Sequence, residues 1–233
     1  MCTCTTCVFF SIIIFQLLFL LLHRSEKVAT MVHEQALQPG FALAWGTSNW
    51  QPARLTALVH ACRVLGVPPP VADAPQFSLT QPSREVWSGT TCCTRAHAAT
   101  LAQEQLALFG WAPLAAGYLT QNAANSSSSS ANDASSSSSS SSSDTNGNSE
   151  GPFETPANEA RRARARTWGQ KRGMTLEQVS VAWALQCYAG AFPSFVSLGT
   201  CDPVHLADLA AATSVRLTRK DVSYLTDGKP LLE

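Results

Sequence analysis

The chain has 233 residues, and its 16 lysines and arginines balance its 16 aspartates and glutamates, so the formal net charge at pH 7 is zero. A balanced charge gives no electrostatic reason to expect a nucleic-acid partner, because nucleic-acid binding depends on a surplus of cationic side chains. Among the eight cysteines, Cys62, Cys187 and Cys201 are isolated from one another and from any histidine at a zinc-ligand spacing. We therefore expect a reducing compartment and no metal site.

Residues 1–30 form a hydrophobic N-terminal segment. Its central run at 8–22, VFFSIIIFQLLFLLL, has no charged residue and, with the uncharged flank before it, approaches the roughly 20 residues that a membrane-spanning helix needs. No basic residue precedes the run, whereas His23, Arg24 and Lys27 follow it, which favours a cytoplasmic position for the rest of the chain. We expect a membrane anchor with a cytoplasmic domain. A cleaved signal or transit segment, or translation from a wrong start, are the alternatives, and without the anchor the protein would be cytoplasmic.

A low-complexity insertion at 121–156 interrupts the domain that we expect at 31–233. Its core, 125–150, is almost entirely serine, asparagine and other small polar residues. Such a segment has too little apolar surface to offset the entropy of ordering, so we expect a disordered loop or linker.

The remaining sequence alternates short apolar runs with helical patterns. The helix starts are the clearest signals: Thr175 with Gln178 has the pattern of a capping box, and Asp202 precedes Pro203 at a first helical position. Strands separated by helices predict an α/β fold with a parallel sheet and right-handed crossovers. We predict strands at 42–46, 71–77, 106–111 and 195–198, and helices at 52–65, 95–106, 160–171, 176–187 and 204–212.

Polar residues follow several of these predicted strands. Ligands of such sheets meet the loops at the carboxyl ends of the strands, which is where Ser48, Asn49 and the segments 73–76, 111–113 and 200–202 fall. A hydroxyl and an amide between a strand and a helix can either cap the helix or face a polar ligand. The spacing alone favours a cap.

A basic cluster of four arginines alternates with alanine inside the helix predicted at 160–171. We interpret Arg161, Arg162, Arg164 and Arg166 as a solvated helix face. Contact with a phosphate is the alternative.

Five blocks occur in the order seen in one known family: GTSNW, PQFSL, GWAPLAAGYLT, GMTLEQVSVAWAL and LGTCDPVHLADLAAA. The chain resembles the C-terminal half of the aldo-keto reductases, and most closely the branch that includes potassium-channel β subunits. The resemblance covers about residues 31–228 apart from the serine tract. It implies a partial (β/α)8 TIM barrel, about its last four βα units.

The resemblance also implies NADPH as cofactor, small carbonyl compounds as substrates and their reduction to alcohols. It places Ser48 and Asn49 on the nicotinamide carboxamide and Trp111 against the nicotinamide ring, although a tryptophan there is also compatible with a barrel-core side chain. The cofactor-binding residues implied are Ser48, Asn49, Trp111, Pro113, Leu114, Gly117, Gly199, Thr200 and Cys201, with 113–117 beside the pyrophosphate and 199–201 near the adenosine 2′-phosphate.

The chain departs from the family pattern at several cofactor positions. Asp73 and Ala74 stand where the family has Asn-Gln, so one amide contact to the nicotinamide is lost. Cys201, His205 and Leu209 replace a common Ser, Gln and Asn, and each lost hydrogen bond would weaken NADPH binding by about 1 kcal/mol. His205 could bind a phosphate, although a surface histidine is the plainer interpretation.

The family's proton-donating tyrosine and its partners belong to the first four strands, which have no counterpart in this sequence. Tyr118, Tyr188 and Tyr224 do not align with that acid, so we nominate no catalytic residue. Four βα units leave open sheet edges, which predicts pairing with a second half-barrel or a homodimer. Three hypotheses follow: a truncated NADP-dependent oxidoreductase, a non-catalytic membrane-anchored accessory protein with a residual nucleotide site, and a product without function.

Overall fold

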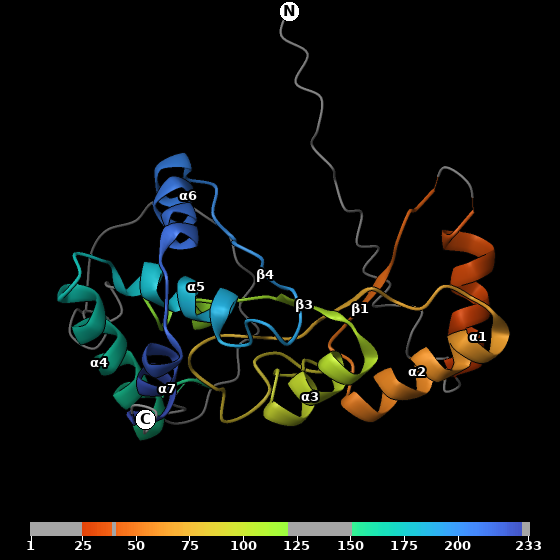
Figure 1. Cartoon of the computed structure of the whole chain (residues 1–233), viewed down its shortest axis with the longest axis horizontal. Coiled ribbons are helices and arrows are strands. Elements are labelled where there is room, and N and C mark those ends of the chain that lie inside the picture. The colour runs from red at the N-terminus through yellow and green to blue at the C-terminus, as the bar shows by residue number, and fades with distance from the viewer. Residues whose placement is uncertain (1–24, 39–40, 121–150, 230–233) are drawn as a thin grey trace, which may run out of the picture. The chain divides into compact units, whose positions relative to one another are not determined.

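A computed structural model describes residues 25–38, 41–120 and 151–229 (Figure 1). The apolar run at 8–22 and the core of the low-complexity insertion lie outside the described residues. Within the part that is described, no helix has both the length and the apolar character needed to cross a membrane. The described residues divide into two compact units. The first holds those up to Gln76 and those within Gly89–Trp111 and Tyr188–Val196, and the second holds those within Phe77–Ser88 and Ala112–Cys187 and those from Ser197 onward.

The first unit contains a parallel sheet of four strands in the order β1-β2-β3-β4. The strands are β1 (Gly46–Ser48), β2 (Ala72–Ala74), β3 (Ala107–Gly110) and β4 (Ser194–Val196). The crossover helices are α2 (Pro52–Leu65) and α3 (Arg95–Glu104), and α1 (Ser25–Met31) with the short η2 (Val32–Ala36) precedes them, α1 packing on α2. The α/β prediction is confirmed, and the sheet is consistent with a partial (β/α)8 barrel.

The first strand differs from its prediction at 42–46, because β1 begins where that strand was expected to end. Gly46 pairs with Ala72, and a Cβ at position 46 would lie 2.8 Å from the Ala72 carbonyl oxygen. Glycine therefore belongs inside this strand, where it permits a close approach of two backbones. Ser48 is consequently the last residue of the strand instead of a loop residue after it.

Two layers of side chains leave the sheet in opposite directions. Thr47, Asp73 and Leu108 share one level of the register and are buried. Successive side chains of a strand alternate between faces, so Ser48 and its partner Ala74 belong to the other face. On β3 and β4, Phe109 and Phe195 are paired and their rings stack with centroids 4.7 Å apart.

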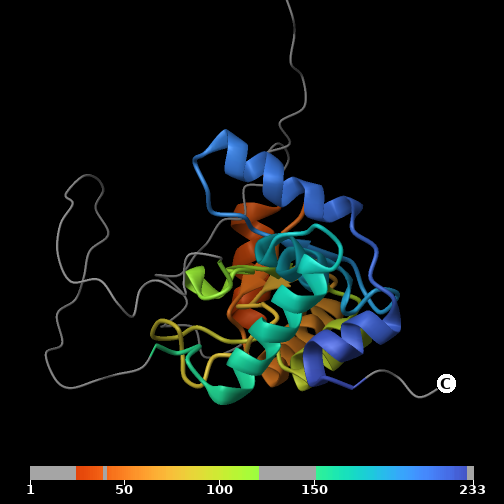
Figure 2. The same cartoon turned by 90° about the vertical axis from the view of Figure 1, so that its left-hand side faces the viewer.

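The second unit is helical (Figure 2). Its elements are η3 (Ala115–Gly117), α4 (Pro156–Gln170), α5 (Leu176–Gln186), α6 (Pro203–Ala210), η5 (Ala211–Ser214) and α7 (Arg219–Asp227). Helix α4 packs against α5 and α7, and α5 packs against α6 and η5. Both predicted helix starts are confirmed, because Thr175 and Gln178 form a reciprocal capping box and Asp202 accepts a hydrogen bond from the Val204 N–H.

The prediction of a solvated arginine face on α4 is wrong for three of its four members. Arg162 is buried, and its guanidinium carbon lies 5.1 Å from the centre of the Tyr118 ring. Arg161 and Arg164 donate hydrogen bonds to the carbonyl oxygens of Leu225 and Thr226 at the end of α7. The last carbonyls of a helix lack partners within it and attract cations, which explains this use of the cluster.

Candidate functional site

Asn49 is the centre of the candidate site, immediately after β1. Its Oδ1 accepts hydrogen bonds from the Thr91 backbone N–H and from the Trp111 indole Nε1–H, each at 3.2 Å. Its Nδ2 donates to Ser48 Oγ at 3.2 Å, and its backbone N–H donates to the Ala74 carbonyl at 3.1 Å. Because both partners of Oδ1 are N–H groups, the network fixes the orientation of this carboxamide.

The structure rejects the interpretation of the Ser48–Asn49 pair as a helix cap. Helix α2 has Gln51 as its N-cap, with no side-chain cap hydrogen bond, and Pro52 at its first position. Proline has no N–H to satisfy, so this helix start needs a capping side chain less than most. Ser48 Oγ instead donates across the sheet to the Ala74 carbonyl at 3.0 Å.

Trp111 follows β3 and is half-buried, so it does not belong to the buried core of its unit. Its backbone N–H donates to the Pro75 carbonyl at 3.1 Å, and its position pairs with Gln76. Ser48, Asn49 and Trp111, which the sequence places in separate segments, therefore lie together at the carboxyl end of the sheet.

This arrangement can receive part of a nicotinamide carboxamide. An amide nitrogen carries two N–H groups, and that of Asn49 uses one on Ser48, so the second has no partner among the described residues. Ser48 Oγ retains acceptor capacity, and the half-buried indole of Trp111 offers an aromatic surface. Ala74 contributes no polar side chain, so the site offers no hydrogen bond to a nicotinamide at the position where the family pattern has a glutamine.

A buried polar network lies on the opposite face of the sheet from Ser48, and two of its three members, Thr47 and His97, were missed in the sequence analysis. Asp73 accepts a hydrogen bond from Thr47 Oγ1 through Oδ1 at 2.6 Å, and its Oδ2 lies 3.0 Å from Nε2 of His97 on α3. Asp73 is thus a strand residue facing α3, not a residue of the loop after the strand. An aspartate inside a strand, followed by a histidine in the next alanine-rich helix, was the available signal.

The two adjacent cysteines before α3 are poor nucleophiles. Burial raises the pKa of Cys92 to about 11. It raises the pKa of Cys93 as well, and the neighbouring Cys92 and Asp73 add to this effect. Because the thiolate is the reactive form, neither thiol supplies a nucleophile at neutral pH.

The other predicted cofactor residues lie in the second unit, in two separate loops that no hydrogen bond between described residues connects. In the first loop Pro113 is buried, and the backbone turns through Ala115 and Ala116 with φ of 53° and Gly117 with φ of 95°. The Gly117 and Leu119 N–H groups donate to the Leu114 carbonyl, each at 3.1 Å, which closes this turn.

The second loop precedes α6. Thr200 Oγ1 accepts a hydrogen bond from the Asp202 N–H at 3.2 Å and lies 3.2 Å from Nδ1 of His205. Cys201 is exposed and free, and a Cβ at Gly199 would meet no atom within 4 Å. The loop therefore presents one hydroxyl and one imidazole that are bonded to each other.

Tyr118 is unsuited to donate a proton. Burial, and then its hydrogen bond to Glu159 Oε2 at 3.0 Å, raise the pKa of this phenol to about 12. No group of three histidine, cysteine or acidic side chains within the described residues could hold a metal ion.

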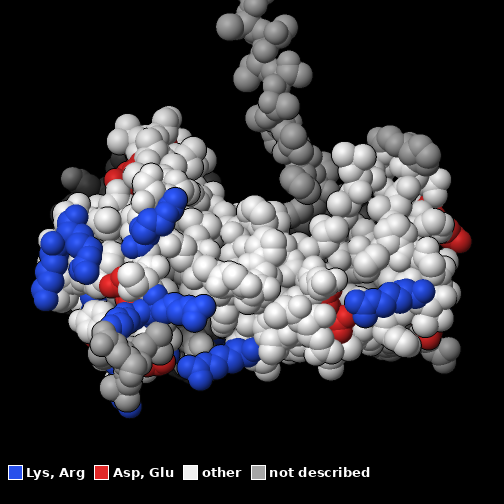
Figure 3. All heavy atoms as spheres, in the orientation of Figure 1, with Lys and Arg blue, Asp and Glu red and all other residues white. Residues whose placement is uncertain are grey.

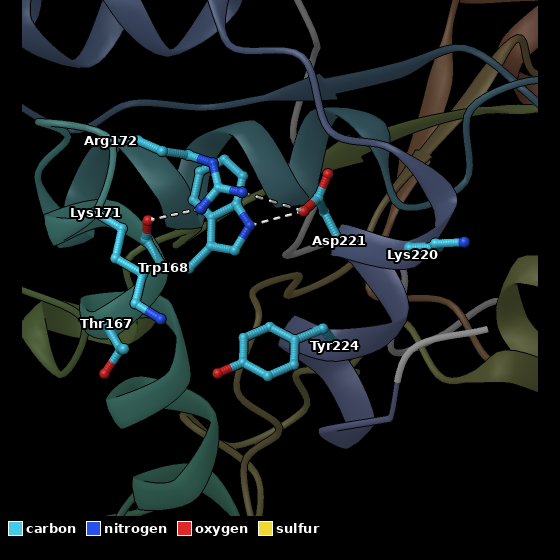
Figure 4. A pocket seen from close by; sticks show the side chains of 7 residues that line it. All are labelled: Thr167, Trp168, Lys171, Arg172, Lys220, Asp221 and Tyr224. Atoms are coloured by element: carbon cyan, nitrogen blue, oxygen red, sulfur yellow. Dashed lines mark hydrogen bonds and ion pairs between the residues drawn. The ribbon is translucent and has the colours of Figure 1, made fainter. Parts of the chain in front are cut away.

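A hollow of about 300 Å³ in the second unit is lined by Thr167, Trp168, Lys171, Arg172, Lys220, Asp221 and Tyr224 (Figure 4). Its central groups are engaged with one another. Asp221 accepts from Trp168 Nε1 at 2.8 Å, and the Arg172 guanidinium lies 3.9 Å from the Trp168 ring centre and 3.9 Å from the Asp221 carboxylate. Basic side chains are frequent on the surface around α4 and α7 (Figure 3). We interpret these contacts as structural ones that hold α4 and α7 together.

A comparison with known protein families agrees with this fold and site geometry. A model of the aldo/keto reductase family matches residues 22–228. The chain belongs to the aldo/keto reductase family. It is accordingly an oxidoreductase of this family by its domain, and the family uses nicotinamide cofactors and acts on small carbonyl compounds. A comparison with curated proteins found no match, and the assignment to the potassium-channel β-subunit branch stays a prediction.

Proposed function

We propose that this chain binds NADPH with its nicotinamide at the carboxyl end of β1 and β3, as the cofactor-holding part of a carbonyl reductase. The observation on which the proposal depends is the 3.2 Å hydrogen bond between Trp111 Nε1 and Asn49 Oδ1. The bond holds an aromatic ring beside an amide group, which supports a site for one small planar ligand.

Each side chain has a distinct part in this proposal. The second N–H of Asn49 donates to the carboxamide oxygen of the nicotinamide, and Ser48 Oγ accepts from its nitrogen. Together with the indole of Trp111, these bonds select which face of the ring is presented. When bound, the nicotinamide supplies a hydride to the carbonyl carbon of the substrate.

The preference for NADPH over NADH rests on the loop before α6. Thr200 and His205 are hydrogen-bond donors to a phosphate, and at present they are bonded to each other at 3.2 Å. We expect the 2′-phosphate to replace that internal bond. The substitution of serine by Cys201 weakens the loop, which predicts a modest preference for NADPH.

The test is a fluorescence titration of the full chain with NADPH. Asn49 and Gln105 both have an amide side chain and a left-handed backbone, with φ of 59° and 60°. Glycine tolerates this backbone, so Asn49→Gly removes the carboxamide without strain, and Gln105→Gly is the matched control. We expect NADPH binding to be about tenfold weaker in Asn49→Gly, because one to two hydrogen bonds are lost. The affinity of the Gln105→Gly control should equal that of wild type. Equal affinities for wild type and Asn49→Gly would refute the proposed site.

A non-catalytic accessory role with a residual nucleotide site is the second candidate. It is favoured by the raised pKa of Tyr118 and by Ala74 in place of an amide. Strands β1 and β4 are the edges of the described sheet, and Phe195 on β4 is 48% exposed, which would suit pairing with a second half-barrel or another copy of the chain. NADPH binding without turnover of small aldehydes would support this role, and turnover by the purified chain would exclude it.

A further inference from the structure

A hydrogen-bonded pair of polar side chains, Asp73 and His97, lies between the sheet and α3, in a layer that α/β folds usually fill with apolar side chains. Asp73 is 0% exposed and His97 is 1% exposed, and their Oδ2 and Nε2 atoms are 3.0 Å apart. Thr47 Oγ1 donates to the other carboxylate oxygen at 2.6 Å. Since burying a carboxylate without partners is costly, all three side chains hold one another in place.

The order of these groups excludes nucleophilic catalysis. In a catalytic triad the histidine stands between the hydroxyl and the acid, so that it can take the hydroxyl proton. Here the carboxylate of Asp73 stands in the middle, and Thr47 donates directly to it. All three side chains are also buried, so a substrate cannot reach them.

The network is joined to the candidate cofactor site by two short routes. Along the sheet, the pair Thr47–Asp73 is followed by the pair Ser48–Ala74, and the Ala74 carbonyl accepts from both Ser48 Oγ and the Asn49 N–H.

The second route runs through the start of α3. His97 lies in the first turn of this helix, three residues after its N-cap Thr94, which accepts from the His97 N–H at 3.2 Å. Thr91, three residues before the cap, donates its N–H to Asn49 Oδ1. The position of His97 therefore helps to set the position of a donor to Asn49.

We propose that Thr47, Asp73 and His97 are positioning residues that hold the Asn49 carboxamide in the orientation needed for the nicotinamide. The inference rests on the proposed function. It assigns these three side chains no contact with the cofactor.

The test measures NADPH affinity in the full chain for variants of Asp73. Asp73→Val removes both hydrogen bonds, whereas Asp73→Asn keeps an acceptor for Thr47 and a donor for a neutral His97. We expect about tenfold weaker binding for the valine variant and a change of about twofold or less for the asparagine variant. Thr47→Val removes a single donor and should give an intermediate loss, and it serves as the test if Asp73→Val does not fold by far-UV circular dichroism.

A matched control exists on the same helix. Glu104 of α3 is 7% exposed and its carboxylate lies 3.1 Å from the guanidinium of Arg63 on α2, which is exposed. Glu104→Gln therefore removes the ionic partner of a buried α3 carboxylate. We expect this variant to be destabilised but to bind NADPH like wild type. Equal loss of affinity in Glu104→Gln and Asp73→Val would show a general structural effect and overturn the inference.

A spectroscopic measurement separates this inference from the proposed function. The ¹⁵N–¹H signals of the Asn49 side-chain amide should shift in His97→Gln and Thr47→Val and stay in place in Glu104→Gln. If wild type does not bind NADPH, the proposed function fails, and these shifts alone decide whether the network positions Asn49. Unshifted signals in both variants would overturn the inference, even in a chain that binds NADPH.

Discussion

Replacement of Trp111 by phenylalanine tests the link between its indole and Asn49. Phenylalanine keeps an aromatic ring but removes the Nε1–H that donates to Asn49 Oδ1 at 3.2 Å. Asn49 then keeps the Thr91 N–H as a donor to Oδ1. Because Asn49 is half-buried and water can replace the lost donor, we expect a cost of about 0.5–1 kcal/mol, which is about a two- to fivefold loss of NADPH affinity. Trp111→Ala also removes the ring and should lose about a further 0.5–1.5 kcal/mol.

The assay is the quenching or enhancement of NADPH fluorescence at fixed protein concentration and temperature. Trp45 provides a control in the same unit, because its indole Nε1 donates to the Pro68 carbonyl at 2.9 Å, away from Asn49. Trp45→Phe also removes one indole hydrogen bond, so it should lower the free energy of unfolding by about 0.5–1 kcal/mol. Its NADPH affinity should equal that of wild type. If Trp111→Phe and Trp111→Ala both bind NADPH like wild type, the indole is a structural side chain and the proposed ring contact is wrong.

Three further predictions concern stability and reactivity. Gly46→Ala should lower the free energy of unfolding by about 1–3 kcal/mol in urea denaturation, because its Cβ would lie 2.8 Å from a backbone oxygen. Gly199→Ala is the control: its Cβ would enter open space, so the free energy of unfolding should change by less than about 0.5 kcal/mol. The pKa of Asp221 is lowered, because burial raises it but hydrogen bonds from neighbouring donors and a nearby guanidinium outweigh burial. Its stabilising contribution is therefore present above its unfolded pKa of about 3.9 and lost as pH falls through the lower folded pKa. The stability difference between wild type and Asp221→Asn should accordingly shrink over that fall in a series of urea denaturations at decreasing pH. Iodoacetamide at pH 8 should label exposed Cys201 well before buried Cys93, as peptide mass spectrometry would show; faster labelling of Cys93 would contradict the burial that raises its pKa.

The helix starts could be predicted from the sequence because they depend on neighbouring residues alone. The capping box of Thr175 with Gln178 and the cap of Asp202 before Pro203 use groups within three residues of each other. The start of α4 at Pro156 follows the same rule, since Thr155 accepts from the Asn158 N–H, but the adjoining low-complexity sequence concealed it.

The first strand could not be placed from local sequence. Glycine is disfavoured in strands, so the local sequence predicts that the strand ends at Gly46. Its actual position depends on the approach of Ala72, which is 26 residues away in the sequence. The shift moves Ser48 into the sheet, where its hydroxyl bonds the Ala74 carbonyl instead of a helix N-terminus.

The role of Asp73 could not be predicted from local sequence either, because it depends on hydrogen-bond partners in other elements of the fold. Local sequence marked it as a departure from the family pattern at a cofactor position. The structure shows that it faces His97 of α3 and Thr47 of β1, away from Ser48. A position that lost a polar contact to the cofactor, by the resemblance, has thus gained an internal one beneath the same site.

In the proposed site, Asn49 supplies the amide group that position 74 does not. Its four hydrogen bonds reach Ser48 at the end of β1, Ala74 on β2, Thr91 before α3 and Trp111 after β3. A helix cap would bond within its own turn, and a solvent-exposed amide would have no reason to bond three distant segments. An amide held by bonds from so many directions loses little further freedom when it binds a ligand, which lowers the entropic cost of binding. Under the proposed function, pre-organisation at Asn49 offsets part of the contact that Ala74 does not provide.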